Sequence, residues 1–113
     1  MTFDEIISRL KSIEDQLRLQ YPDLAHDNEK AILARSAKVS EEWGELIEEI
    51  LLKLGLQRKE KLLGHDPKNL EKEFGDVFNS LILLGIALHI DVKTAIEMRV
   101  GEMYSKYGLT DEK

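Results

Sequence analysis

Glu73-Phe74-Gly75-Asp76-Val77-Phe78-Asn79-Ser80-Leu81-Ile82 is the stretch that decides the fold of this chain. At about 100° per residue, its polar side chains fall on one narrow stripe of a helix, and its apolar side chains occupy the rest of the circumference. A helix that is apolar around most of its girth must be mostly buried. The stretch therefore predicts a helix over about residues 68–89 at the centre of an all-α packing.

Two acidic residues of this helix are poorly explained as part of a solvated face. Glu73 and Asp76 lie in its first half, where burial is expected. Buried carboxylates persist only when they are paired, protonated or bound to a cation. Pairing with Lys38, Lys72 or Arg35 is the structural alternative. The first half of the helix thus predicts either salt bridges or a cation site.

An earlier acidic cluster, Glu41-Glu42-Trp43-Gly44-Glu45, lies on a helix expected over about residues 29–54. Its glutamates share one face with Glu48 and Glu49 and repel one another at these spacings, although such Glu-rich faces are commonly just solvated. Trp43 falls on the opposite, apolar side and is expected in the core or at an interface. An all-oxygen cluster drawn from two helices favours Mg²⁺ or Mn²⁺ over zinc.

Apolar periodicity predicts a further helix before this one. It begins near Phe3 and ends before Pro22, because proline restricts the residue that precedes it. The polar segment after Pro22 is expected to be a connection. Asp27 or Asn28 is available as the N-cap of the helix that follows.

The C-terminal part of the chain is expected to hold one more helix, over about residues 92–107, with Asp91 as its N-cap and Gly108 closing it. A basic and mobile loop is expected over residues 55–68, and a frayed tail from Thr110. The whole chain, residues 1–113, is expected to be one four-helix-bundle-like domain.

Composition limits the partners of the domain. The chain has 113 residues, a net charge of −6 and no cysteine. The acidic charge argues against nucleic-acid polymers and anionic membranes as partners. No apolar run reaches the roughly 18 residues that span a bilayer. The default expectation is a cytoplasmic protein that binds an anionic ligand only through metal ions.

The two acidic motifs together resemble those of the MazG-like, all-α nucleoside triphosphate pyrophosphohydrolases, which are related to the dimeric dUTPases. The family pattern is Glu-Glu-x-x-Glu followed after a spacer by Glu-x-x-Asp, and the similarity covers roughly residues 31–107. One departure is the spacer of 27 residues between Glu45 and Glu73, which is at the long end for the family and brings in a basic segment that would reshape the pocket.

The resemblance implies Mg²⁺-dependent hydrolysis of an NTP or dNTP to the monophosphate and pyrophosphate, with Mn²⁺ as an alternative ion. It implies Glu42, Glu45, Glu73 and Asp76 as the principal metal ligands. It also implies Glu41 as the residue that positions or deprotonates the attacking water, with Glu42 as the competing assignment. Adjacent residues on a helix diverge by about 100°, so only one of the two can face the metal squarely.

Four further residues are candidates for substrate contact, each with a structural alternative. Lys38 is either a phosphate contact or a counter-charge for the acids. Asn79 either reaches the base or sugar or satisfies a neighbouring backbone group. Arg58 either closes over phosphates or is part of a solvated loop. Lys106 is a candidate phosphate contact from a neighbouring subunit.

Burial predicts self-association, because a bundle of this size has too little surface to cover its apolar helices. A homodimer is expected at least, and a homotetramer fits the same argument. A non-catalytic helical module that binds nucleotide or another protein is the alternative function. The sequence is compatible with several nucleobases, and with either cleaning of the nucleotide pool or a regulatory role.

Overall fold

The computed structural model describes residues 1–110, which form helices and no strand. The helices are α1 (Phe3–Gln20), α2 (Pro22–His26), α3 (Asn28–Lys53), α4 (Lys59–Leu62), α5 (Asn69–Ala87) and α6 (Val92–Lys106). The prediction of an all-α fold is confirmed, and the tail that was expected to fray lies, after Thr110, outside the described residues. None of the described helices combines the length and the apolar character needed to cross a membrane.

Polar side chains cap the starts of α3 and α6, as expected. The Asp27 carboxylate accepts a 3.1 Å hydrogen bond from the backbone N–H of Lys30, so Asp27 rather than Asn28 is the N-cap of α3. Asp91 caps α6 in the same way, accepting from the N–H of Thr94 at 3.1 Å. These bonds satisfy backbone donors that a helix start leaves free.

Three helices end on a residue with left-handed backbone conformation. These residues are Gly55 after α3, His89 after α5 and Gly108 after α6, with φ of 71°, 57° and 72°. At the end of α5 the N–H of Ile90 donates to the carbonyl of Gly85 at 2.9 Å. This is the Schellman pattern, which satisfies the last carbonyls of a helix. The helix stops expected at Gly55 and Gly108 are therefore confirmed.

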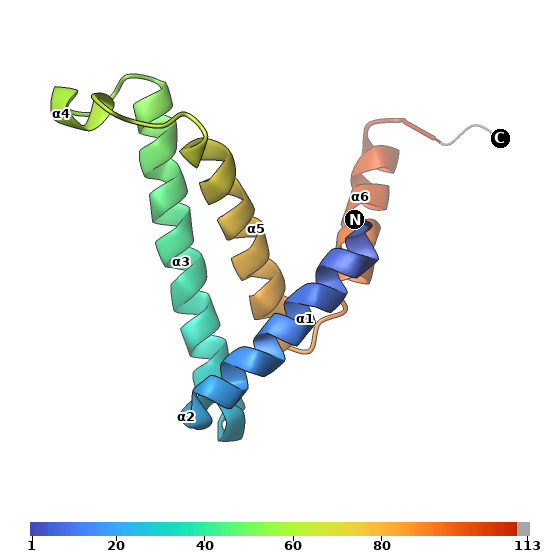
Figure 1. Ribbon diagram of the computed structural model, residues 1–113. Helices are drawn as coiled ribbons and strands as arrows, with labels where there is room; N and C mark the ends of the chain where they lie inside the picture. The colour runs from blue at the N-terminus through green and yellow to red at the C-terminus, as the bar shows by residue number, and fades with distance from the viewer. Residues whose placement is uncertain (111–113) are drawn as a thin grey trace.

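The helices form a V in which α3 and α5 run antiparallel along one arm, while α1 and α6 lie along the other (Figure 1). One chain does not close into a compact four-helix bundle. Its radius of gyration is 17.7 Å, whereas about 13 Å is ordinary for a domain of this length. The difference arises because α6 turns away from the hairpin, and none of its residues is buried.

A buried acid fixes α1 on the hairpin. Glu14 is 1% exposed and accepts hydrogen bonds from Nε of Arg35 on α3 at 2.7 Å and from Nε of Arg18 at 3.1 Å. Two guanidinium groups thus neutralise one carboxylate inside the junction. The position of α1 is set by charge as well as by its apolar stripe.

The segment between α3 and α5 is more ordered than a solvated loop. It contains the single turn of α4, and two of its side chains reach back to α3. Lys61 Nζ lies 2.7 Å from Glu48 Oε1, and His65 Nε2 contacts the Glu49 carboxylate. These contacts hold the segment against the end of the hairpin.

Candidate metal centre

The site lies on the seam where α3 meets α5. Glu42 and Leu46 are buried on α3, and Val77 and Ser80 are buried on α5. Positions four apart on one helix, and three apart on the other, lie on the same face. The seam is therefore apolar at Leu46 and Val77 but carries an acid at Glu42.

Three carboxylates converge on this seam. One oxygen from each of Glu42, Glu73 and Asp76 lies within 4.8 Å of the others, so two helices contribute to one cluster. Oε2 of Glu42 and Oε2 of Glu73 are both buried and have no hydrogen-bond partner among the described residues. Glu42 is only 8% exposed. Buried carboxylate oxygens without partners are costly, and a cation would satisfy them.

Glu45 belongs to the same neighbourhood. The negative charge of Glu42 is the main cause that raises the pKa of the Glu45 carboxyl. Partial desolvation and the facing carboxyl of Glu73 raise that pKa further. Like charges at close range oppose ionisation. The raised pKa agrees with the close approach of the acids at the seam.

Two lysines flank the cluster. Lys38 Nζ lies 3.1 Å from Glu42 Oε1, and Lys72 Nζ lies 3.3 Å from Asp76 Oδ2 and 3.4 Å from Glu73 Oε1. Hydrogen bonding to Glu42 raises the pKa of Lys38, and hydrogen bonding to Asp76 raises that of Lys72. Both ammonium groups are well exposed, so these pairs are weak. Lys38 and Lys72 are two of the residues that the sequence offered as ion-pair partners of the acids, in place of a cation.

The charge of the cluster stays negative despite the lysines. The three carboxylates of the cluster and the neighbouring carboxylate of Glu45 outnumber the two flanking ammonium groups. Arg35 pairs with Glu14, and among the described residues it forms no ion pair with any of these four acids. The remaining excess of acid is what a divalent cation would balance.

The other predicted residues are placed as follows. Glu41 is exposed and contacts Lys38 at 3.4 Å, so its carboxylate is not in the cluster. Asn79 is exposed on α5. Arg58 is the N-cap residue of α4, at the end of the hairpin. Lys106 ends α6 on the other arm of the V, so within one chain it does not join the acids (Figure 1).

Sequence reasoning did not identify Glu14 or the contact between Glu49 and His65. Glu14 interrupts the apolar stripe between Leu10 and Leu17, which is a signal that a buried pair was needed there. The contact of His65 with Glu49 has no such signal, because loop residues have no helical period. The side chain of His65 is part-buried in this contact.

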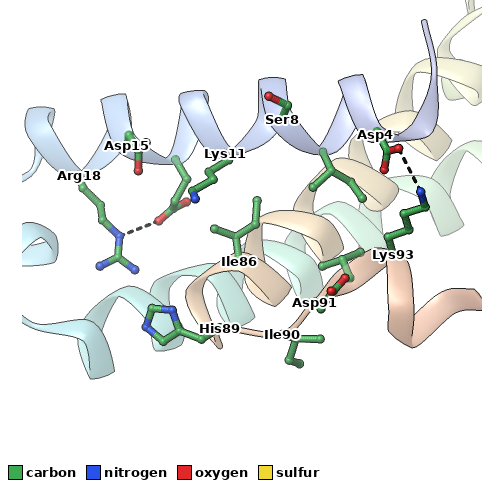
Figure 2. A pocket seen from close by; sticks show the side chains of 13 residues that line it. Asp4, Ser8, Lys11, Asp15, Arg18, Ile86, His89, Ile90, Asp91 and Lys93 are labelled. Atoms are coloured by element: carbon green, nitrogen blue, oxygen red, sulfur yellow. Dashed lines mark hydrogen bonds and ion pairs between the residues drawn. The ribbon is translucent and has the colours of Figure 1, made fainter. Parts of the chain in front are cut away.

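A separate cleft of about 840 Å³ lies between α1 and the turn that joins α5 to α6. Figure 2 shows Lys93 reaching Asp4 across it, at 3.0 Å, and Arg18 bonded to a carboxylate, that of Glu14. Asp91 in its wall is engaged as a helix cap. Most charged groups of the cleft already have partners, so it offers fewer free ligand atoms than the seam.

The seam is therefore the candidate functional site, defined by Glu42, Glu45, Glu73 and Asp76. Its geometry is an all-oxygen donor set from two helices, with buried oxygens on both. Comparisons of the whole chain with models of protein families, with curated proteins and with solved structures found no match.

Proposed function

We propose that this chain is an Mg²⁺-dependent nucleoside triphosphate pyrophosphohydrolase, which cleaves an NTP or dNTP to the monophosphate and pyrophosphate. The observation that carries the proposal is the convergence of Glu42, Glu73 and Asp76, with two buried carboxylate oxygens left without partners. The resemblance of the two acidic motifs to those of the MazG-like enzymes supports the same interpretation.

The donor set fits a hard divalent cation. Glu42, Glu45, Glu73 and Asp76 offer carboxylate oxygens only, which Mg²⁺ and Mn²⁺ prefer. These four residues would hold the ion. When bound, the ion neutralises triphosphate charge and lowers the pKa of a bound water.

The roles of the neighbouring side chains follow from where they lie. Glu42 is turned into the seam and is assigned as a ligand, whereas Glu41 is exposed one residue away and is assigned as the acceptor of the proton from the attacking water. Lys38 lies beside both and can donate to a phosphate oxygen once an ion has replaced it at Glu42. Asn79 is assigned to the base or sugar.

The remaining substrate contacts come from outside the seam. Arg58 is assigned to the phosphates from the end of the hairpin, and Lys106 from a neighbouring copy, because it lies on the other arm of its own chain. The proposed enzyme thus acts as a homodimer or homotetramer. With a net charge of −6, the chain needs the metal ion to hold an anionic substrate.

A non-catalytic helical module is the second candidate function. The ion pairs of Lys38 with Glu42 and of Lys72 with Asp76 favour it, because salt bridges account for part of the acidic charge without any ion. In such a module the acids stabilise the hairpin. They do not hold a substrate.

The test is pyrophosphate release from a panel of standard and modified NTPs and dNTPs, with Mg²⁺ or Mn²⁺. We expect at least one member to be cleaved, and Glu42→Gln to abolish the cleavage. Glu42→Gln should also weaken Mn²⁺ binding by about tenfold or more, since even outer-sphere groups of metal sites contribute about 10- to 100-fold. Glu71→Gln, at an exposed position of α5 that is close in sequence to Glu73 but outside the cluster, is the control.

Two outcomes separate the candidates. Cleavage that requires Glu42 and tolerates Glu71→Gln supports the hydrolase. A panel that stays inert, with Mn²⁺ affinity equal in the parent chain and in Glu42→Gln, supports the module instead. The preferred member of the panel identifies the nucleobase.

A further inference from the structure

The segment that joins α3 to α5 has few attachments to the rest of the chain. We call its residues 55–68 the strap, which contains α4 and crosses the end of the hairpin (Figure 1). In the described part of the chain, residues 57–65 form backbone hydrogen bonds only with one another. The leucines of the strap do not anchor it, because Leu56, Leu62 and Leu63 are 67%, 37% and 72% exposed. The position of the strap therefore depends mainly on polar side chains.

Two ion pairs join the strap to α3. Lys61 pairs with Glu48, and His65 pairs with Glu49. The side chains of the first pair are 40% and 46% exposed, whereas those of the second are only 16% and 13% exposed. Water and salt screen an exposed pair strongly and a more buried pair much less. The contact between His65 and Glu49 is therefore the stronger attachment.

The strength of this contact depends on the protonation of the imidazole ring. A protonated ring gives Glu49 a charged donor, and hydrogen bonds with a charged partner are about twice as strong as neutral ones. Histidine is the side chain that ordinarily gains or loses its charge between about pH 5 and 8. The pair is strongest where His65 is charged and Glu49 is ionised. It weakens as the pH rises and the ring loses its proton.

No other cation replaces the imidazolium group. Within residues 1–110, His65 is the only positively charged partner of Glu49. The charged side chains closest in sequence to this pair, on α3, on the strap and on α5, form no ion pair with either residue: Glu45, Glu48, Lys53, Lys61, Asp66 and Glu71. Deprotonation of His65 therefore leaves the charge of Glu49 without compensation.

The contact lies close to the metal centre. Glu49 follows Glu42 by seven residues and Glu45 by four, so it lies on the same face of α3, about 6 Å further along the axis than Glu45. The strap has a net formal charge of +2, in a chain whose net charge is −6. Its basic residues are Arg58, Lys59, Lys61 and Lys68, and its acids are Glu60 and Asp66. A latched strap holds this positive charge at the end of the acidic seam.

We propose that the strap is a pH-sensitive cover at this end of the seam, held on Glu49 by protonated His65 and released as the pH rises. A single proton selects between the two arrangements. The imidazolium group binds the Glu49 carboxylate, and the neutral ring leaves that carboxylate to water. Protonation of a histidine is a local change of charge that can move a segment in this way. The proposal does not depend on the hydrolase activity.

The test measures the motion of the strap in the full chain. Because the chain has no cysteine, Leu63→Cys, at an exposed position of the strap, takes a single nitroxide spin label. We expect a slow component to dominate the EPR spectrum at pH 6 and a fast component to grow at pH 8. The ratio of slow to fast component should fall by about fivefold or more, the difference between a charged and a neutral hydrogen bond. Identical spectra at the two pH values overturn the proposal.

Variants of the labelled chain identify the proton. His65→Gln retains a polar side chain that does not titrate, so its spectrum should be mostly fast and the same at both pH values. Glu49→Gln should have the same effect. His26→Gln, at an exposed histidine of α2, is the matched control and should leave the pH response intact. A pH response that survives in His65→Gln, or that is lost in His26→Gln, overturns the proposal.

Discussion

Arg35 of α3 donates a 2.7 Å hydrogen bond to Glu14 of α1, inside the junction between the two arms. Glu14→Gln removes the negative charge and leaves Arg35 and Arg18 facing each other with no counter-charge. Breaking a buried pair in this way destabilises a protein by about 3–5 kcal/mol. We expect a loss of that size in urea unfolding at fixed protein concentration. Asp15→Asn, on the adjacent exposed position, should change stability by less than about 0.5 kcal/mol. Equal effects of the two variants would show that the ion pairs of Glu14 contribute little to stability.

Glu45→Gln should raise the thermal stability of the metal-free protein at pH 7. The pKa of Glu45 is raised above 4.5 in the folded chain, chiefly by the charge of Glu42. Between 4.5 and the raised pKa the folded state binds more protons than the unfolded state, so stability falls as the pH rises. Glutamine removes that repulsion, but it also removes one of the carboxylates proposed to hold the ion. The increase in Tm on adding Mn²⁺ should therefore shrink.

Glu48→Gln provides a control of opposite sign. Lys61 lowers the pKa of the Glu48 carboxyl. The ionised carboxylate therefore stabilises the fold above pH 4.5, and this stabilisation is lost as the pH falls through the lowered pKa. This variant should slightly lower the Tm at pH 7 and leave the Mn²⁺ effect intact. A fall in the metal-free Tm for Glu45→Gln as well would contradict the crowding of the acids.

Lys72→Met should tighten Mn²⁺ binding. The Lys72 ammonium group lies 3.3 Å from Asp76 and 3.4 Å from Glu73, where it competes with a cation. Exposed ion pairs contribute about 0.2–1 kcal/mol, so a gain of up to about fivefold is expected in a titration at low salt. Lys30→Met, at an exposed site near the start of α3, should leave the affinity unchanged. Weaker binding by Lys72→Met would mean that Lys72 helps the site.

His89→Gly should stabilise the fold. His89 has a φ of 57°, a conformation that costs a residue with a Cβ about 1–2 kcal/mol. Glycine removes this strain, but it also increases the conformational entropy of the unfolded chain, which offsets part of the effect. We therefore expect the free energy of unfolding to rise by about 0.5–1 kcal/mol. Gly55→Ala, at φ of 71°, should be destabilising in the same unfolding assay. If His89→Gly is destabilising instead, the imidazole makes a contribution that outweighs its backbone strain.

Gly85→Ala should destabilise the packing of α5 on the start of α6. A Cβ at Gly85 would lie 2.7 Å from Cγ2 of Val92, which is too close. Overpacking of this kind costs about 1–3 kcal/mol. Gly101→Ala meets nothing within 4 Å and should stabilise α6 by about 0.5–1 kcal/mol. Val92→Ala combined with Gly85→Ala should recover part of the loss, and the absence of recovery would place the clash elsewhere.

The helix boundaries were the part of the fold that the sequence predicted well. A helix start or stop depends on residues that are close together in the sequence, so it can be recognised there. Each of the expected boundary residues lies at a helix boundary: Pro22, Asp27, Asp91 and Gly108. The short helices α2 and α4 were expected as connection and loop. Segments of one turn have too few residues to show an apolar period.

The sequence indicated which acids meet at the α3–α5 seam better than it indicated how α3 is oriented there. Periodicity assigned Glu42 to a charged face of α3 and Trp43 to an apolar face. In the structure α5 packs along the boundary between the two faces, so Glu42 is buried and Trp43 is half exposed. A hydrophobic pattern gives angles between residues on one helix, but the direction from which a second helix arrives depends on tertiary packing.

The acids of the seam and the exposed aromatic rings of the hairpin are neighbours in the sequence. Glu42 is followed by Trp43, and Glu73 is followed by Phe74, so each backbone turn that presents an acid to the seam presents an aromatic ring to the exposed side of the α3–α5 hairpin. Thermodynamic linkage makes any coupling between them reciprocal. The factor by which pairing of two copies changes the affinity for Mn²⁺ is also the factor by which Mn²⁺ changes the pairing constant. In a chain that both binds the proposed ion and pairs with a second copy, the affinity for the ion would therefore depend on the concentration of the chain.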